Sequence, residues 1–148
     1  MKIDALLNLE PDSELTISNE PFTYSGKASV TLEGGDELVW LFQADGAMLA
    51  ISPSDEELMF YRQLDEALEP ENETIGWQGK EYEFSYEDVG SVTEAEGDCP
   101  VDSDERYGFS DYESSGGERI RLIRNDSTGD VMTFVGSVVG EEDVVLVE

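Results

Sequence analysis

Histidine is absent from this chain of 148 residues, and cysteine occurs once, as Cys99. Without imidazole, the usual Ser-His-Asp and Cys-His catalytic arrangements are excluded. A single cysteine cannot form an internal disulfide, which favours a reducing compartment. Asp98 and Asp102 lie close to Cys99, and their charges are expected to raise the pKa of the thiol, which disfavours it as a nucleophile. We therefore expect a protein that is not an enzyme.

Positive charge is also scarce. Lys and Arg number 8 against 36 Asp and Glu, which gives a net charge of −28. Proteins that bind nucleic acids neutralise phosphates with clustered Lys and Arg, and anionic membrane surfaces repel a chain of this sign. We therefore expect no direct nucleic-acid binding. The charge favours a basic protein surface or a polyamine as partner.

Long apolar runs are missing as well. No stretch approaches the length of a membrane span, and the first residues do not resemble a signal peptide. These absences predict no membrane insertion and a cytoplasmic location.

The acidity has two interpretations, which can both hold. Carboxylates spread along a whole chain are typical of proteins that stay soluble in high salt, where the Debye length falls to about 3 Å near 1 M. Alternatively, the acidic surface binds a cationic partner. The sequence does not decide between halophilic adaptation and function.

Turn residues recur at short intervals along the whole chain. Short runs rich in β-branched and aromatic residues lie between Gly-, Pro- or Asp-bearing turns. The predicted strands include residues 28–32, 37–42, 48–51, 119–123, 131–139 and 144–147. The polar-apolar alternation of Arg119-Ile120-Arg121-Leu122 suits a strand buried on one face. We predict an all-β, mainly antiparallel fold over residues 1–148, a sandwich or a barrel, with at most one short helix.

Residues 54–68 are ambiguous. Ser54 with Glu57 resembles a helix capping box, and apolar residues follow at helical spacing. The run Leu58-Met59-Phe60-Tyr61 is equally a strand core after a turn. We predict a strand over Glu57 to Leu64. If the chain has a short helix, we expect it near Ser54 to Leu68.

A weak internal repeat suggests two related β halves, at about 15–69 and 75–147. Tyr24-Ser25-Gly26-Lys27 resembles Trp77-Gln78-Gly79-Lys80, and each is followed by a Gly-Gly-acidic turn before an apolar strand. Two packed copies of a small β-unit would explain this pattern.

Two groups of side chains are candidate sites. Asp98, Asp102, Asp104 and Glu105 form the densest set of oxygen ligands, although their spacing does not match an EF-hand loop and a solvated acidic loop explains them better. Tyr82, Phe84 and Tyr86 alternate at period two, which predicts an aromatic strand face. Trp77, Tyr82 and Tyr86 are the candidate residues for binding a cationic partner through cation–π contacts, with core packing as the alternative.

The order of several motifs resembles the domain-of-unknown-function family 4178. They are Trp77-Gln78-Gly79-Lys80-Glu81-Tyr82, Gly90-Ser91-Val92, Glu94-Ala95-Glu96-Gly97, Tyr107 to Glu113, Gly116-Gly117, Leu122-Ile123 and Phe134-Val135-Gly136. The likeness covers roughly Leu15 to Val144 and is strongest over Trp77 to Gly136. It implies a β-rich prokaryotic domain that is not known as an enzyme, often encoded near polyamine aminopropyltransferases and membrane-stress proteins.

The resemblance assigns no catalytic residues. We therefore expect a non-enzymatic binding or scaffold module, linked to a membrane-stress or polyamine-related system. The alternative is an acidic mimic of nucleic acid that inhibits a DNA-binding protein, which would need carboxylates patterned on one face.

Overall fold

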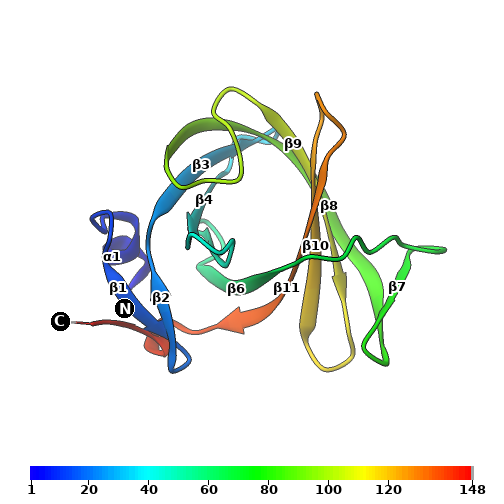
Figure 1. Cartoon of the computed structure of the whole chain (residues 1–148), viewed down its shortest axis with the longest axis horizontal. Helices are drawn as coiled ribbons and strands as arrows, with labels where there is room; N and C mark the ends of the chain where they lie inside the picture. The colour runs from blue at the N-terminus through cyan, green and yellow to red at the C-terminus, as the bar shows by residue number, and fades with distance from the viewer. Residues whose placement is uncertain (148) are drawn as a thin grey trace.

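The computed structural model describes residues 1–147 and contains a closed antiparallel barrel with smaller layers on two sides (Figure 1). Eight strands close the barrel. In spatial order they are β3 (Gly26–Leu32), β4 (Glu37–Phe42), β5 (Met48–Ser52), β6 (Glu57–Leu64), β11 (Val131–Val139), β10 (Glu118–Asn125), β9 (Arg106–Glu113) and β8 (Lys80–Gly97), which pairs back to β3. The predicted all-β antiparallel class is confirmed, and the architecture is a barrel.

Each predicted half contributes one antiparallel meander to this barrel. The strands β3 to β6 come from the first half and β8 to β11 from the second, and the two meanders join through the β6–β11 and β3–β8 pairs. Gly26 and Lys27 are the first residues of β3. Gly79 directly precedes β8 and Lys80 is its first residue, so this part of the repeat occupies equivalent places in the two halves. The Gly-Gly turns do not, because one joins β3 to β4 and the other joins β9 to β10.

Two smaller layers cover the outside of the barrel. On one side, β1 (Glu14–Ile17) pairs with β2 (Glu20–Thr23) and β12 (Val144–Leu146), next to the helix α1 (Ile3–Leu7) and the 3₁₀ turn η1 (Glu141–Asp143). On the other side, β7 (Thr74–Trp77) pairs with the first residues of β8. The single short α-helix of the described chain is therefore at residues 3–7, and residues 57–64 form the strand that the sequence predicted.

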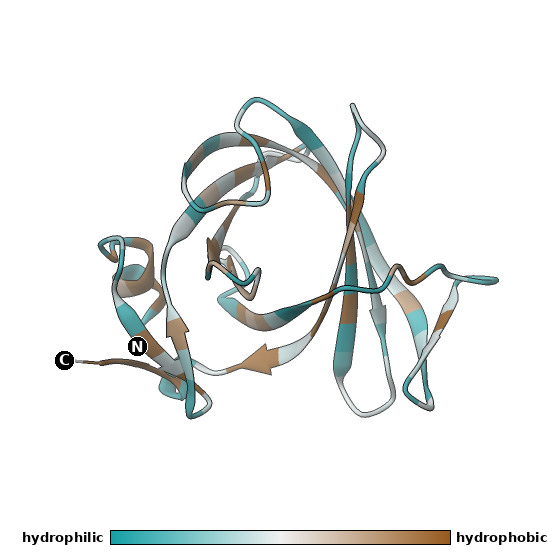
Figure 2. Ribbon diagram, viewed as in Figure 1, coloured by the Kyte–Doolittle hydropathy of each residue, from teal (hydrophilic) through white to brown (hydrophobic). Residues whose placement is uncertain are grey.

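Three hydrophobic clusters hold these layers together, and Figure 2 shows apolar residues along several barrel strands. The barrel interior contains the largest, with Trp40, Phe42, Tyr61, Phe109 and Phe134. A second cluster lies between the barrel wall and the β1–β2–β12 sheet, and a third lies under β7. Strands β4 and β5 are buried on both faces because they separate the first two clusters.

The loop between β8 and β9, residues 98–105, closes one end of the barrel. It places Val101, 1% exposed, in the interior cluster. The backbone N–H of Asp102 donates to the hydroxyl of Tyr107 at 2.9 Å, and the amide of Asn125 donates to the same oxygen at 3.3 Å. These contacts fix the loop over that end, so the opposite end is the one that remains open.

Two glycines mark close approaches that a side chain would block. A Cβ at Gly136 would overlap the backbone carbonyl of Phe60 on the neighbouring strand, β6. Gly97 has a φ of +69°, and a Cβ there would meet the backbone of Ser25 at the place where the end of β8 pairs with the start of β3. Both glycines therefore permit strand pairings on which barrel closure depends.

Within residues 1–147, the structure has no helix with the length and apolarity that a membrane crossing requires.

Candidate functional site

The open end of the barrel contains a cavity of about 280 Å³. It lies opposite the end that Val101 closes, because its lining comes from the β3–β4 and β5–β6 turns and from the adjoining ends of β8, β9 and β10. The wall includes the apolar side chains Leu38, Trp40, Met59 and Phe109, and charged side chains surround the entrance. Its size is at the lower limit of small-molecule sites.

A buried ion pair forms one wall of this cavity. Arg121 Nε donates to Asp111 Oδ1 at 2.7 Å and Arg121 Nη2 donates to Oδ2 at 2.8 Å, while the two side chains are 8% and 2% exposed. The guanidinium also lies over the rings of Tyr61 and Phe109, with centroids at 5.3 and 4.9 Å. Burial disfavours its charge, but Tyr61 and Asp111 outweigh this and the pKa of Arg121 is raised. The arginine therefore stays charged inside the barrel.

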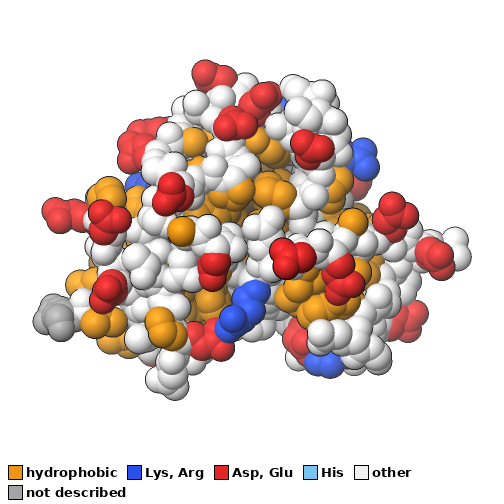
Figure 3. Space-filling model, in the orientation of Figure 1, with side chains coloured by type: hydrophobic (Ala, Val, Ile, Leu, Met, Phe, Trp, Pro, Cys, Tyr) orange, Lys and Arg blue, Asp and Glu red, His pale blue; other side chains and the backbone are white. Residues whose placement is uncertain are grey.

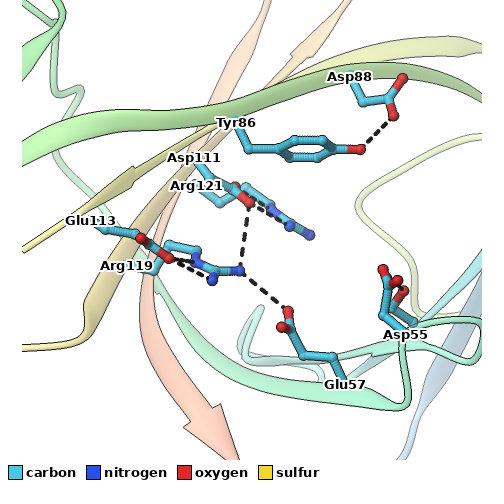
Figure 4. A network of polar contacts seen from close by, with 9 residues as sticks. Asp55, Glu57, Tyr86, Asp88, Asp111, Glu113, Arg119 and Arg121 are labelled. Carbon is cyan, nitrogen blue, oxygen red and sulfur yellow. Dashed lines mark hydrogen bonds and ion pairs between the residues drawn. The ribbon is translucent and has the colours of Figure 1, made fainter.

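Arg119 extends this pair into a network (Figure 4). Its Nη2 donates to Glu113 at 2.7 Å, and its Nη1 donates to Glu57 at 3.3 Å and lies 3.7 Å from Asp111. Because these carboxylates come from β6 and β9, the two arginines of β10 connect three strands at the open end.

Tyr86 reaches the same cavity because of a β-bulge. The register of β8 against β9 shifts between Phe84 and Tyr86, so Phe84 pairs with Tyr112 whereas Tyr86 pairs with Asp111. The ring of Tyr86 lies 6.3 Å from that of Phe109, and its hydroxyl donates to Asp88. Partial burial and this hydrogen bond raise the pKa of Tyr86 to about 12. Its phenol is therefore neutral at physiological pH.

Three carboxylates at the entrance have no cationic partner among residues 1–147. They are Asp36, Asp55 and Asp88, all of which line the cavity. Asp55 accepts a hydrogen bond from the hydroxyl of Ser52 at 3.1 Å, and Asp88 accepts one from Tyr86 and one from the backbone of Val89. Carboxylate lone pairs remain for a ligand.

Unpartnered donors lie deeper in the same barrel. The Nε1–H of Trp40 and the hydroxyl of Tyr61 are fully buried and have no hydrogen-bond partner within residues 1–147. Burial raises the pKa of Tyr61 to about 12. Within residues 1–147, Arg121 donates hydrogen bonds from Nε and Nη2 only, so its Nη1 has no protein acceptor there.

The structure separates Tyr86 from the other two aromatic residues of the predicted strand face. Tyr82 is completely buried beneath β7 beside Tyr112, and the ring of Phe84 also packs on Tyr112, at 5.8 Å, whereas Tyr86, 44% exposed, is in the cavity. The single aromatic face expected from the alternation is therefore wrong, and the physical reason is the bulge. Trp77 lies in the outer cluster, where its Nε1–H donates to Glu66 at 2.6 Å. Of the candidate partner-binding residues Trp77, Tyr82 and Tyr86, only Tyr86 lies at the candidate site.

The four candidate metal ligands, Asp98, Asp102, Asp104 and Glu105, are all in the closing loop at the other end of the barrel. Among residues 1–147, no three or more such side chains gather into a group that could hold a metal ion. Glu105 accepts a hydrogen bond from Ser127 at 3.1 Å. The backbone N–H groups of Asp98, Asp102 and Asp104 donate to Ser25, Tyr107 and Val92, respectively, and so hold the loop on the barrel.

Cys99 is half-buried within the same loop. Burial is the main reason that the pKa of its thiol is raised, and the charges of Asp98 and Glu96 add to this effect. The expected direction is confirmed, although the expected cause was the neighbouring charges alone.

Sequence reasoning missed Arg121 and its ion pair with Asp111. The alternation in β10 assigns Arg121 to a polar, solvent-facing side of the strand, but in the structure that side faces the barrel interior, where Arg121 and Ile123 are buried. The scarcity of Lys and Arg in the sequence could have pointed to Arg121. In a chain of net charge −28, each retained arginine is a candidate for a specific structural or binding contact.

Comparison with known proteins gives one family. A family model described as "Domain of unknown function (DUF4178)" matches residues 10–141. No curated protein and no solved structure matches the chain.

Proposed function

The chain belongs to the DUF4178 family, and we propose that it works as a non-enzymatic binding module whose site is the cavity at the open end of the barrel. The absence of histidine from the whole chain supports the non-enzymatic part. A link to a membrane-stress or polyamine-related system is part of the proposal and rests on the family resemblance alone.

The Arg121–Asp111 pair in the cavity wall is the observation that carries this proposal. A buried ion pair contributes little net stability, and well-packed hydrophobic residues often replace one without loss. The barrel interior already has a large apolar core, so stability alone does not require the pair. Charged groups held at the edge of a largely apolar cavity are typical of a binding site, where they orient a ligand.

Tryptophan fluorescence gives a direct test. The chain has two tryptophans, and Trp77 is outside the barrel. A Trp77→Phe variant therefore leaves Trp40, in the cavity wall, as the only tryptophan. We expect a saturable change in Trp40 emission when the variant is titrated with small polar amines and amino acids at low salt.

The matched control compares two variants that each remove one negative charge. Asp88→Asn alters the cavity entrance, whereas Asp130→Asn alters an exposed turn that is not part of the cavity. Only the first should change the titration. Equal responses in the two variants, or no saturable response to any compound, would count against the cavity as the binding site.

The nucleic-acid mimic is the less favoured alternative. A mimic needs carboxylates gathered together, whereas Figure 3 shows acidic side chains scattered over the face in view, along its edge and nearer its middle. This distribution supports the binding module over the mimic.

A further inference from the structure

We propose that the cavity binds a small zwitterion, a molecule with an ammonium group at one end and a carboxylate at the other. This inference rests on the proposed function, since it assigns a ligand class to the same cavity. It follows from the way in which positive and negative groups are separated around the cavity.

Arg121 provides the place for the ligand's carboxylate. Its Nε and Nη2 are held by Asp111, and its Nη1 has no acceptor within residues 1–147. The side chain is 8% exposed and stays charged. In Figure 4 the guanidinium extends beyond Asp111 into the space that Tyr86, Asp55 and Glu57 surround. A guanidinium with a free donor at a cavity wall is suited to a ligand oxygen, and carboxylate is its preferred acceptor.

Asp55 and Asp88 provide the place for the ammonium group. Figure 4 shows both on the far side of the same space from Asp111 and Glu113, and neither has a cationic partner among the described residues. Asp36 lines the same entrance. The ring of Tyr86 lies beside them and offers a π-face to a cation.

The charges around the cavity disfavour ligands of a single sign. Five carboxylates line it, those of Asp36, Asp55, Glu57, Asp88 and Asp111, together with the two guanidiniums of Arg119 and Arg121. A simple anion would enter a region of net negative charge and meet the strong negative field of the whole chain. A simple cation would leave the free Nη1 of Arg121 without an acceptor. A zwitterion satisfies both ends at once.

The cavity volume and its apolar wall set the size of the ligand. A volume of about 280 Å³ is near the lower end of the range for small-molecule sites, which suits a small ligand such as an amino acid or a short ω-amino acid. Leu38, Met59 and Phe109 line the same cavity and would contact its methylene carbons.

The test uses the full chain with the Trp77→Phe substitution and a series of ω-amino acids from β-alanine to aminohexanoate. Each is compared with the alkylamine, the alkyl carboxylate and the diamine of the same length, at low salt and in molar KCl. Isothermal titration and Trp40 emission both report binding. We expect one ω-amino acid to bind at least roughly tenfold more tightly than its alkylamine and its carboxylate, since each removed group loses a charge-assisted hydrogen bond.

Two variants test which side chain binds the ammonium group of the ligand and which binds its carboxylate. Asp88→Asn should reduce the affinity for the ω-amino acid and for the alkylamine, but not for the carboxylate. Arg121→Lys should reduce the affinity for the ω-amino acid and for the carboxylate. If Arg121→Lys fails to fold, Arg119→Gln tests the same end from the neighbouring guanidinium, with Asp130→Asn as the control.

The outcomes separate this inference from the proposed function. Tighter binding of the alkylamine or diamine than of any ω-amino acid would overturn the zwitterion while leaving a binding module for cations. Tighter binding of the carboxylate would overturn it in favour of an anion. If none of the compounds binds, both the ligand class and the cavity as a small-molecule site are overturned.

Discussion

Arg121 and Asp111 form a bidentate ion pair inside the barrel, with Nε–Oδ1 and Nη2–Oδ2 distances of 2.7 and 2.8 Å. The residues lie on adjacent strands, β10 and β9, and are directly opposite each other in the register. Their pairing is thus fixed by the same backbone ladder that holds the cavity wall. Its energetic role differs from that of an exposed salt bridge, since the two side chains are only 8% and 2% exposed and each compensates the other's burial.

Asp111→Asn should destabilise the protein by about 3–5 kcal/mol, because the guanidinium of Arg121 would remain buried without its counter-charge. The double variant Asp111→Leu with Arg121→Met should recover most of this loss. Urea unfolding followed by circular dichroism measures both. A double variant as unstable as the single one would show that the pair is required for folding itself and would weaken the argument that it serves binding.

Gly136→Ala should cost about 1–3 kcal/mol, because the added methyl group forces the backbones of β11 and β6 apart. Gly76→Ala is the matched control. It is also in a strand, β7, but has open space around it and should change stability by less than about 0.5 kcal/mol. Thermal and urea unfolding of the two variants side by side would decide the matter, and equal effects would refute the close approach.

Tyr82→Ala should reduce stability by about 3–5 kcal/mol, since its ring is fully buried. Tyr86→Ala, in contrast, should reduce stability by about 1 kcal/mol and mainly affect ligand binding. The comparison separates two residues that the sequence placed on one face. Similar losses of stability would indicate that Tyr86 also belongs to the core.

Stability should fall above pH 10 because of Tyr61. Its pKa is about 12 in the folded protein, against the ordinary value of 10.0 that applies to the unfolded chain, so the unfolded chain loses this proton first as the pH rises. The folded state then holds more protons than the unfolded state between about pH 10 and 12, and unfolding becomes easier across that range. Below about pH 10 the contribution is fully present.

Tyr61→Phe tests this assignment. It removes a buried hydroxyl without a partner in residues 1–147, so it should leave neutral-pH stability unchanged or slightly higher. It should also reduce the loss of stability above about pH 10. Guanidinium unfolding at a series of alkaline pH values provides the measurement, and an unchanged alkaline profile would contradict the role of Tyr61.

The melting temperature should rise between low salt and molar KCl. Carboxylate repulsion at a net charge of −28 is screened as the Debye length falls from about 10 Å at 0.1 M to about 3 Å at 1 M. A triple variant with Gln at Glu81, Glu83 and Glu87, all exposed on β8, should show a smaller rise. A melting temperature that does not respond to KCl would exclude halophilic adaptation as the reason for the acidity.

The strands could be predicted from sequence because their patterns are local. The boundaries of β6 agree with the predicted range of 57–64, and the turn residues place most other strands correctly. The bulge at Phe84 to Tyr86 could not be predicted, since it depends on the register against β9 and not on the residues of β8 alone. The same limit applies to part of the candidate site. Asp111 and Arg121 face each other in a hairpin of consecutive strands, β9 and β10, whereas only the strand order brings Glu57 of β6 to Arg119.

The closure of the barrel also sets the order in which the chain can fold. The β3–β8 and β6–β11 ladders join residues from opposite halves, such as Gly26 with Gly97 and Leu64 with Thr133. Loop-closure entropy makes such distant pairings slow, whereas each meander forms through neighbouring strands. We therefore expect the two ladders to form late in folding, and the cavity, whose lining comes from both meanders, to be complete only after the ring has closed.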